Sequence, residues 1–428
     1  MFTDLHRRYP DAAIRAGTLD DVALLARRIK AELPVVTSEI GDSWIHGAAS
    51  DPGKVSRYRA LMRARRELSE EDRRRVNQQL MLIPEHTWGL DYKSKAKDTG
   101  HFDAAGFASV IHSPENERMT RSWQEQRAYL EKAVASVSPE AGDQLRRALA
   151  LCAPQPFDAN DGWTPVAAGT CFEVGESKLS FNVNGAISRL FLGGRELASE
   201  SDCLAAPMYE VFSGDDMERF NTQYVDCSRF PWLKDLARDD FYKVGAEKVV
   251  TAHQRCGMTL AGLYRKDATI AAVLRPASQA LVKDYGCPAQ MVLRVTLKER
   301  EADISLDWFD KQPTRVPEAL WLGFHPLAQG VQVRKLSRWI DPTDVVSHGG
   351  RRLHATDWGV RYLSGVQVES IDGAVVNVGE PHLWNFDDTL PSTNDGVWFC
   401  LCNNMWNTNF PLWYGEDAHF RFRVSVTE

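Results

Sequence analysis

The chain has 428 residues, and its 58 acidic and 51 basic side chains give a net charge of −7. Hydrophobic residues make up 43% and charged residues 25%, a balance that excludes a disordered or fibrous protein. The length predicts two or three domains, and the negative charge argues against a dedicated nucleic-acid binder.

Neither a secretory signal nor a membrane-spanning segment is predicted. The first thirty residues carry charges every few positions, and no later stretch reaches 18 uninterrupted apolar residues. The eight cysteines are scattered without a Cys-x-x-Cys pair, and Cys400 and Cys402 share one face of a predicted strand. We therefore expect a cytoplasmic protein with reduced thiols and no membrane partner.

Clusters of Pro, Gly and Asp divide the chain into three predicted regions, residues 1–50, 51–154 and 155–428. In the first region, Asp20 and Asp21 start a predicted helix over residues 19–33, and a β-branched run predicts a strand at residues 35–37. Helix followed by strand is the pattern of an α/β domain. One helix and one strand make only part of such a domain, so another segment must cover them.

The second region is strongly helical. Asp51 and Ser69 are start signals for two helices, and a third is predicted from about Asn116. Apolar residues recur at helical spacing in all three. Three helices with one apolar face each predict a small bundle.

After Pro154 the sequence changes to short alternating runs separated by Gly, Asp and Asn. Examples are residues 179–183, 291–297, 304–308 and 420–424. Period-two alternation over about 270 residues predicts a large antiparallel β-sandwich, bigger than an immunoglobulin domain.

A loop rich in polar and aromatic residues follows the predicted strand of the first region. It contains Glu39, Asp42, Trp44 and His46. The carboxylates can act as acid, base or hydroxyl acceptors, and the indole offers a flat face to a sugar ring. The alternative is a connecting loop whose carboxylates cap the next helix.

A second cluster lies where the second predicted helix ends. Glu85, His86 and Asp91 accompany Trp88 there, which predicts either a site with a metal ligand and acid–base groups or a hydrogen-bonded structural histidine. The nearby His101-Phe102-Asp103 lies in a polar, basic stretch, so we interpret it as a loop.

Three stretches of the β region mix Asn, Asp and Trp, as a carbohydrate-binding surface does. They are residues 212–220, 382–388 and 403–414. In the last of them, Asn404 and Trp406 are the predicted sugar contacts. Buried Trp and turn-forming Asn explain the same composition without a ligand.

The order of these motifs resembles the later two thirds of a class II α-mannosidase of glycoside hydrolase family 38, and more closely an uncharacterised bacterial branch of that superfamily. The likeness covers nearly the whole chain, and only Asn-Asn-x-Trp-x-Thr-Asn-Phe at residues 403–410 is close to the family pattern. The other segments that carry it are residues 33–36, 39–46, 50–54, 58–59, 85–90 and 317–321.

The resemblance implies the end of an α/β barrel, a three-helix bundle and a galactose-mutarotase-like supersandwich. It also implies a zinc ion, or another divalent metal, for which only His86 matches a family ligand. Glu85 and Thr87 stand where the family has a second His and an Asp. The remaining ligands and the nucleophile belong to a barrel half that would precede Met1.

We therefore expect a glycoside-hydrolase-like protein that acts on α-linked sugars. A retaining glycosidase needs two carboxylates that flank the bond, and Asp42 and Glu85 are the predicted pair. The alternative is a non-catalytic carbohydrate-binding or assembly subunit, as a homo-oligomer or with a partner chain that supplies the missing barrel half. In a third hypothesis the β region itself is the enzyme, with catalytic candidates His253, His325, His348, His354 and His382.

Overall fold

The computed structural model describes residues 1–41, 43–84, 88–92, 100–225 and 230–427. The chain divides into two compact units, Met1–Glu39 and Ile40–Glu428. The division falls before the boundary expected near residue 50, and the helical and β regions expected to meet near residue 155 belong to one unit. None of the described helices is long and apolar enough to cross a membrane.

The first unit consists of short helices, namely α1 (Phe2–Arg8), α2 (Leu19–Arg28) and η1 (Lys30–Glu32). Thr18 and Asp21 form a capping box at the start of α2, with the Thr18 N–H donating to the Asp21 carboxylate at 2.8 Å. The strand prediction for residues 35–37 is wrong, because these residues have no regular structure. A strand needs a neighbouring strand for its backbone, and none of the described strands pairs with residues 35–37. The pattern expected of a barrel end is thus not observed here.

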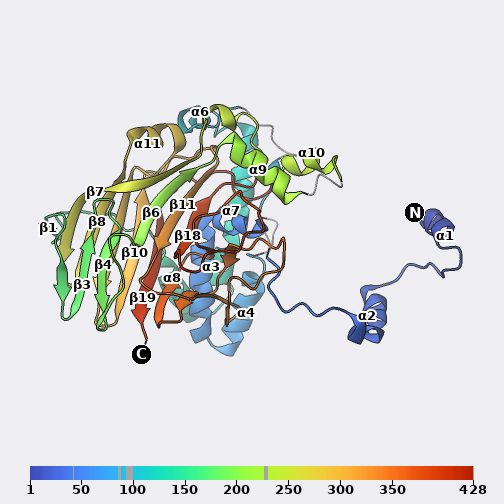
Figure 1. Cartoon of the computed structure of the whole chain (residues 1–428), viewed down its shortest axis with the longest axis horizontal. Coiled ribbons are helices and arrows are strands. Elements are labelled where there is room, and N and C mark those ends of the chain that lie inside the picture. Colours follow the sequence, from blue (N-terminus) through green and yellow to red (C-terminus); the bar gives the residue numbers. More distant parts are fainter. Residues whose placement is uncertain (42, 85–87, 93–99, 226–229, 428) are drawn as a thin grey trace. The chain divides into compact units, whose positions relative to one another are not determined.

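The second unit contains a large antiparallel β-sandwich with helices (Figure 1). Its described strands pair in two sheets. The first has the order β2-β3-β4-β6-β11-β18-β17-β14, with β5 beside β4, and the second has the order β1-β7-β8-β9-β10-β19-β16-β15-β12-β13.

The strands of the first sheet are β2 (Phe172–Val174), β3 (Ser177–Phe181), β4 (Ile187–Leu192), β5 (Arg195–Glu196), β6 (Leu204–Val211), β11 (Glu318–Phe324), β14 (Leu353–Ala355), β17 (Val375–Val378) and β18 (Val397–Asn403). Those of the second are β1 (Thr164–Val166), β7 (Gln254–Lys266), β8 (Thr269–Pro276), β9 (Gln290–Leu297), β10 (Glu301–Phe309), β12 (Val331–Lys335), β13 (Arg338–Ile340), β15 (Gly359–Tyr362), β16 (Val366–Ser370) and β19 (Ala418–Val426). Strand β7 pairs with β6 through residues 254–257 and with β8 through residues 258–266, so it links the sheets.

The core lies between the two sheets. Phe324 and Phe399 of the first sheet contact Phe422 of the second, with ring centroids 5.3 and 5.1 Å from it. In β10 the residues at alternate positions from Ala302 to Trp308 are buried, as the period-two pattern predicts. The expected β-sandwich is therefore confirmed at the level of antiparallel sheets that share a core.

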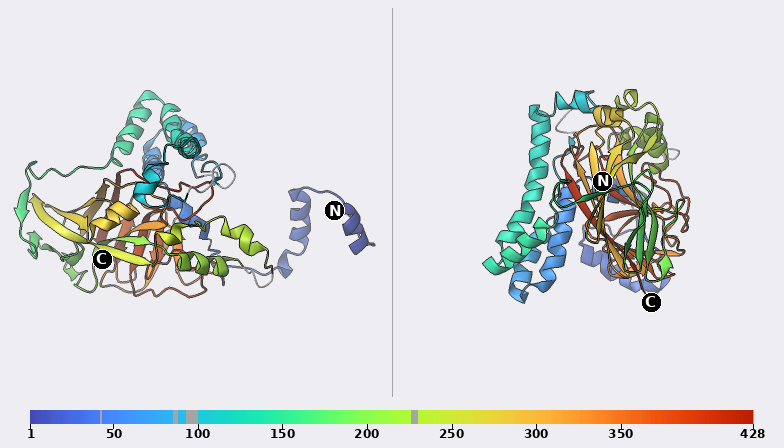
Figure 2. Two further views of the ribbon diagram at one scale, coloured as in Figure 1. Left: turned by 90° about the horizontal axis from the view of Figure 1, so that it is seen from above. Right: turned by 90° about the vertical axis from the view of Figure 1, so that its left-hand side faces the viewer.

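Helices of the second predicted region pack on one flank of the sandwich (Figure 2). The main ones are α3 (Pro52–Ala64), α4 (Glu70–Leu80), α7 (Pro114–Ala135) and α8 (Pro139–Ala150), the last of which was not expected. Asp51 and Ser69 cap α3 and α4 as predicted, and Ser113 caps α7. These four helices share a buried apolar core of their own, which includes Leu61 and Leu130.

Further short elements connect these parts. They are η2 (Ser43–Ala49), η3 (Arg65–Glu67), α6 (Ala104–Ala108), α9 (Gly214–Tyr224), α10 (Leu233–Arg238), η4 (Ala246–Lys248) and α11 (Gln279–Tyr285). Hydrogen bonds join the helices to the sandwich: Arg59 of α3 donates to the carbonyls of Thr356 and Ser370, each at 2.7 Å.

Candidate functional site

Four segments of polar and aromatic composition meet beside the end of β18, and we call this place the loop junction. It consists of residues 43–49, 212–224, 382–388 and 403–410. Trp44 is its centre, with its ring 5.0 Å from that of Trp406 and its Nε1 donating to the Tyr224 hydroxyl at 2.6 Å. Phe212 and Trp384 pack at 5.2 Å. The tertiary structure thus brings together segments that the sequence marks separately.

The junction is closely packed. A Cβ on Gly47 would lie 2.3 Å from the ring of Phe410, so only glycine fits where these two segments cross. Trp406 has 2% of its surface exposed, and its Nε1 has no hydrogen-bond partner among the described residues. In the second unit, Trp406 is therefore a core residue and not an exposed platform for a sugar.

His46, which belongs to the junction, is buried with 4% of its surface exposed. Its carbonyl accepts a hydrogen bond from Asn403 Nδ2 at 2.9 Å. Burial, reinforced by the nearby His382, lowers the pKa of His46 to about 3. Burial, together with Arg352, lowers the pKa of His382 to about 4. Both imidazoles are therefore neutral at ordinary pH.

The two histidines line a small cavity of about 20 Å³, which is room for about one water molecule. His46 Nδ1, Arg352 Nε and Asn385 Oδ1 lack hydrogen-bond partners within the described structure. A water molecule in this cavity can satisfy such atoms. A sugar ring cannot enter so small a space.

The remaining predicted contacts are mostly structural. Trp88 has 7% of its surface exposed, and the Lys54 ammonium lies 3.3 Å from the centre of its ring. Asn404 accepts a hydrogen bond from the Glu318 N–H and donates to the carbonyls of Thr314 and Val316. Both amide hydrogens of Asn404 are thus used by the backbone, and the sugar contact predicted for it is not supported by this geometry.

Several predicted residues cannot be placed in the site. Asp42, Glu85 and His86 lie outside the described residues, and Glu39 belongs to the first unit. Asp91 is partly buried. Among the residues that the structure describes, no three His, Cys, Asp or Glu side chains form a group that could hold a metal ion. A metal at His86 stays a prediction.

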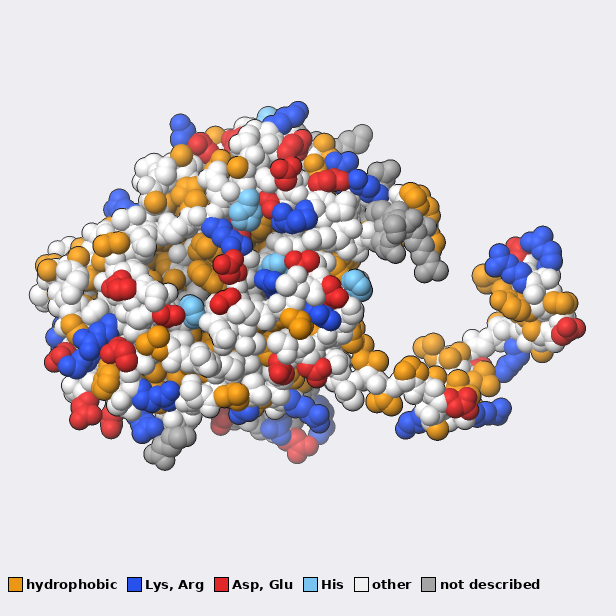
Figure 3. Space-filling view, viewed as in Figure 1, with side chains coloured by type: hydrophobic (Ala, Val, Ile, Leu, Met, Phe, Trp, Pro, Cys, Tyr) orange, Lys and Arg blue, Asp and Glu red, His pale blue; other side chains and the backbone are white. Residues whose placement is uncertain are grey.

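Lys or Arg, Asp or Glu and His side chains gather near the middle of the face drawn in Figure 3. A network of charged side chains, partly buried, lies beside the junction near the end of β6. Glu210, which is 1% exposed, accepts hydrogen bonds from Arg255 Nε at 2.7 Å and Trp321 Nε1 at 2.8 Å. His253 Nε2 lies 3.1 Å from the same carboxylate, and His253 Nδ1 lies 3.1 Å from Asp216. We call these residues the sheet-face network.

The network fixes the protonation of His253. Hydrogen bonds to Asp216 and then Glu210 raise the pKa of His253 to about 9. Although burial opposes it, the hydrogen bonds from His253 and Ser213 lower the pKa of Asp216. An imidazolium with both nitrogens engaged positions neighbouring groups but cannot act as a base at neutral pH.

The other histidines of the β-region hypothesis have separate surroundings. His354 is fully buried, and its pKa is lowered by burial to about 3. The His348 N–H donates to Asp388. His325 is half-buried beside Asp202 and lines an open pocket on the sheet face. The structure does not gather these residues into one group.

That open pocket, which we call the sheet-face pocket, has a volume of about 330 Å³. Strands β6, β11 and β18 and the segments that connect strands around residues 201–203, 380 and 395 contribute to its lining. Its lining residues are Ser201, Cys203, Ala206, Gly323, Phe324, His325, Glu380, Asp395 and Trp398. The size suits a ligand as large as a monosaccharide.

Trp398 supplies an aromatic surface in this pocket. Gly323 pairs with Trp398 across β11 and β18, and a Cβ on Gly323 would lie 2.8 Å from the indole. Glycine therefore allows the half-buried ring to lie against the strand. Arg255, held by Glu210, reaches Glu380 at 3.4 Å, so the sheet-face network extends to a carboxylate that lines the pocket.

Sequence reasoning missed Trp398 and Glu380. Trp398 stands in the apolar run Val-Trp-Phe-Cys-Leu-Cys, where a core strand was the natural interpretation. A signal was nevertheless present, because alternation in β18 places Trp398 on the face opposite to the buried Phe399. The small residues across from it, Ala206 and Gly323, become visible only when the strands are paired.

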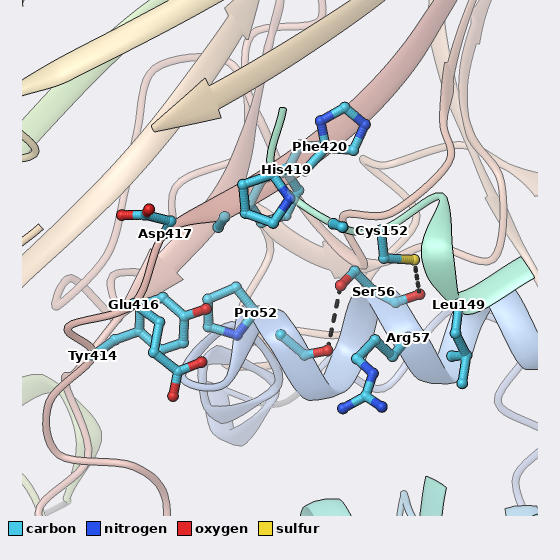
Figure 4. A pocket seen from close by; sticks show the side chains of 14 residues that line it. Pro52, Ser56, Arg57, Leu149, Cys152, Tyr414, Glu416, Asp417, His419 and Phe420 are labelled. Carbon is cyan, nitrogen blue, oxygen red and sulfur yellow. Dashed lines mark hydrogen bonds between the residues drawn. The ribbon is translucent and has the colours of Figure 1, made fainter. Parts of the chain in front are cut away.

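Another pocket, of about 260 Å³, lies between α3, the end of α8 and the start of β19 (Figure 4). Its polar groups already have partners: Arg57 contacts Glu131, and His419 Nδ1 lies 2.8 Å from Asp307. Burial raises the pKa of the Cys152 thiol to about 11, which makes it a poor nucleophile. We therefore assign no catalytic or binding role to this pocket.

Comparison with known proteins gives one family match. A family model described as "Domain of unknown function (DUF5054)" matches residues 48–305. No curated protein matches the sequence. The chain is similar to solved structures of a galactose mutarotase-like protein from Lactobacillus casei ATCC 334 (9% identity, TM-score 0.29, 60% of this chain and 99% of that one) and the Slr1438 protein from Synechocystis sp. PCC 6803 (12%, 0.26, 62% and 98%). At these TM-scores neither similarity indicates a shared site.

Proposed function

The chain belongs to the DUF5054 family, and we propose that its β-sandwich binds a carbohydrate in the sheet-face pocket. The observation that carries this proposal is the half-buried indole of Trp398 in an open pocket with two carboxylates, Glu380 and Asp395. An indole packs against the C–H face of a sugar ring, while carboxylates accept hydrogen bonds from hydroxyls.

Sugar binding is tested by replacing the aromatic surface. Trp398→Ala should weaken binding at least tenfold in a titration with a panel of mono- and oligosaccharides, because the truncation removes the stacking face. Trp339, another half-buried tryptophan, lies on β13 outside the pocket, and Trp339→Ala is the matched control. Equal loss in the two variants, or no binding by the unmodified chain, would overturn the proposal.

A second proposal is hydrolysis of α-linked sugars in the manner of glycoside hydrolase family 38. It is favoured by the contacts of Trp44 and His46 with residues 403–410, because residues 39–46 and 403–410 both carry the resemblance to that family. Asp42 and Glu85 would be the carboxylate pair and His86 a ligand of zinc or another divalent metal. A partner chain would supply the other ligands.

The hydrolase proposal needs an activity measurement. We expect release of aryl alcohol from an aryl α-mannoside, alone or with added partner chain, and a loss of at least a hundredfold in Asp42→Asn and Glu85→Gln. Metal analysis and the mass in solution complete the test. Unchanged activity in both variants would exclude this carboxylate pair, while sugar binding at Trp398 would be unaffected.

A further inference from the structure

The sheet-face pocket is acidic. Among its described lining residues, Glu380 and Asp395 are carboxylates, and none is Lys or Arg. A third carboxylate, Asp202, lies next to His325 of the lining, with 3.5 Å between His325 Nε2 and Asp202 Oδ1. Hydrogen bonds from Ser201 and Ser199 lower the pKa of Asp202, which keeps it charged.

One guanidinium, that of Arg255, contacts Glu380 of the pocket lining and is held by other groups. Arg255 Nε donates to Glu210 at 2.7 Å, its NH2 group donates to the Pro381 carbonyl at 2.5 Å, and its NH1 group contacts Glu380 at 3.4 Å. Every nitrogen of Arg255 is therefore engaged. Arg255 offsets part of the negative charge of Glu380, while the described lining of the pocket contains two carboxylates and no Lys or Arg.

An indole beside carboxylates suits a cation as well as a sugar ring. The face of Trp398 attracts positive charge through its quadrupole, and an ammonium group forms charge-assisted hydrogen bonds with carboxylates. Glu380 is 74% exposed and Asp395 is exposed, so both can turn toward a ligand without losing buried contacts. A uronate or a sugar phosphate would instead meet like charges.

We propose that the sheet-face pocket selects amino sugars that carry a free ammonium group. This inference rests on the proposed sugar binding and names its ligand class. The sugar ring lies on Trp398, and the ammonium lies between Glu380 and Asp395. Acetylation of the amine removes its positive charge, so the pocket should not prefer an N-acetylated sugar over the neutral parent sugar.

The test compares matched sugars at low and high salt. Binding of glucosamine, galactosamine and mannosamine is measured by saturation-transfer NMR against glucose, galactose, mannose, N-acetylglucosamine and glucuronate. At least one amino sugar should bind about tenfold tighter than its neutral parent in low salt, equivalent to about 1.4 kcal/mol. The advantage should shrink severalfold at about 0.5 M salt, because exposed charges are screened.

Variants that remove the charge of one carboxylate test whether Glu380 and Asp395 recognise the ammonium group of the sugar. Glu380→Gln and Asp395→Asn should each reduce the affinity for the amino sugar about threefold or more and leave that for the neutral parent within about twofold. Glu125→Gln, which removes an exposed carboxylate on α7, is the control that should change neither affinity.

The outcomes separate the two proposals. Binding of the neutral parent with equal affinity, or stronger binding of glucuronate, would overturn the amino-sugar inference and leave sugar binding in place. Absence of binding by every sugar would remove the proposed function itself. An amino-sugar preference that survives in both charge-removing variants would show that these carboxylates do not recognise the ammonium.

Discussion

Glu318 and Lys311 form an ion pair that water barely reaches. Their side chains are 2% and 0% exposed, and Lys311 Nζ lies 2.6 Å from Glu318 Oε1. The Tyr209 hydroxyl contacts the other carboxylate oxygen at 2.7 Å. Burial raises the pKa of Glu318, and Lys311 opposes that rise. The motif around residue 318 thus has a structural role in β11.

Removing one charge of this pair should destabilise the folded chain. Glu318→Gln leaves the Lys311 ammonium buried without its counter-charge, and we expect a loss of about 3–5 kcal/mol in the free energy of unfolding. Urea denaturation of the variant measures it. The double variant with Lys311→Met should recover part of the loss, and additive losses would show that the two groups do not interact.

At the scale of elements, single side chains join helices to one another. Asp51 caps α3 by accepting from the Lys54 N–H at 3.0 Å, and the same carboxylate contacts Arg127 Nε of α7 at 2.8 Å. Arg127 also reaches Glu416 before β19. One buried carboxylate therefore sets the start of α3 and its position beside α7.

The two roles of Asp51 can be separated. Asp51→Asn should keep most of the cap and lose the ion pair, whereas Asp51→Ala should lose both and unfold about 1 kcal/mol more easily than the Asn variant. Denaturant midpoints of the two variants and the unmodified chain give the comparison. Equal stability of Asn and Ala at this position would mean that the cap contributes nothing.

At the scale of the whole molecule, histidines contribute to the pH dependence of stability between about pH 4 and about pH 10. The folded-state pKa values of His46, His354 and His382 lie below the ordinary value of 6.5. The unfolded chain therefore binds more protons, and stability falls as the pH decreases below about 6.5. His253 has the opposite sign, because its folded-state pKa is raised to about 9. Its contribution is complete below about pH 6.5 and is lost as the pH rises through about 9.

We accordingly expect the melting temperature to be highest near neutral pH and to fall on both sides. Thermal unfolding followed from about pH 4 to about pH 10 measures this profile. His253→Gln should lower the melting temperature more at about pH 6 than at about pH 10, because the imidazolium exists only on the acid side. A constant difference across this range would show that His253 does not contribute through its charge.

Some elements could be predicted because the signal for them lies within a short stretch of sequence. Alternation predicted β9 and β10, and the caps at Asp51 and Ser69 predicted the starts of α3 and α4, because these signals depend on residues a few positions apart. The strand predicted at residues 35–37 is not observed, because its formation depends on a partner strand that the local sequence does not specify. A β-branched run becomes a strand only where another strand pairs with its backbone.

The amino-acid sequence was sufficient to predict the β-sandwich, the helices α3, α4 and α7 and the segments that meet in the loop junction, but not α8 or the sheet-face pocket. Only the tertiary structure decided that the residues of the loop junction are packed against one another and that Trp398, Glu380 and Asp395 surround an open pocket. The reason is physical: burial and exposure depend on which strands and loops become neighbours. Gly323 and Trp398 are 75 positions apart in the chain, and their contact exists only because β11 pairs with β18.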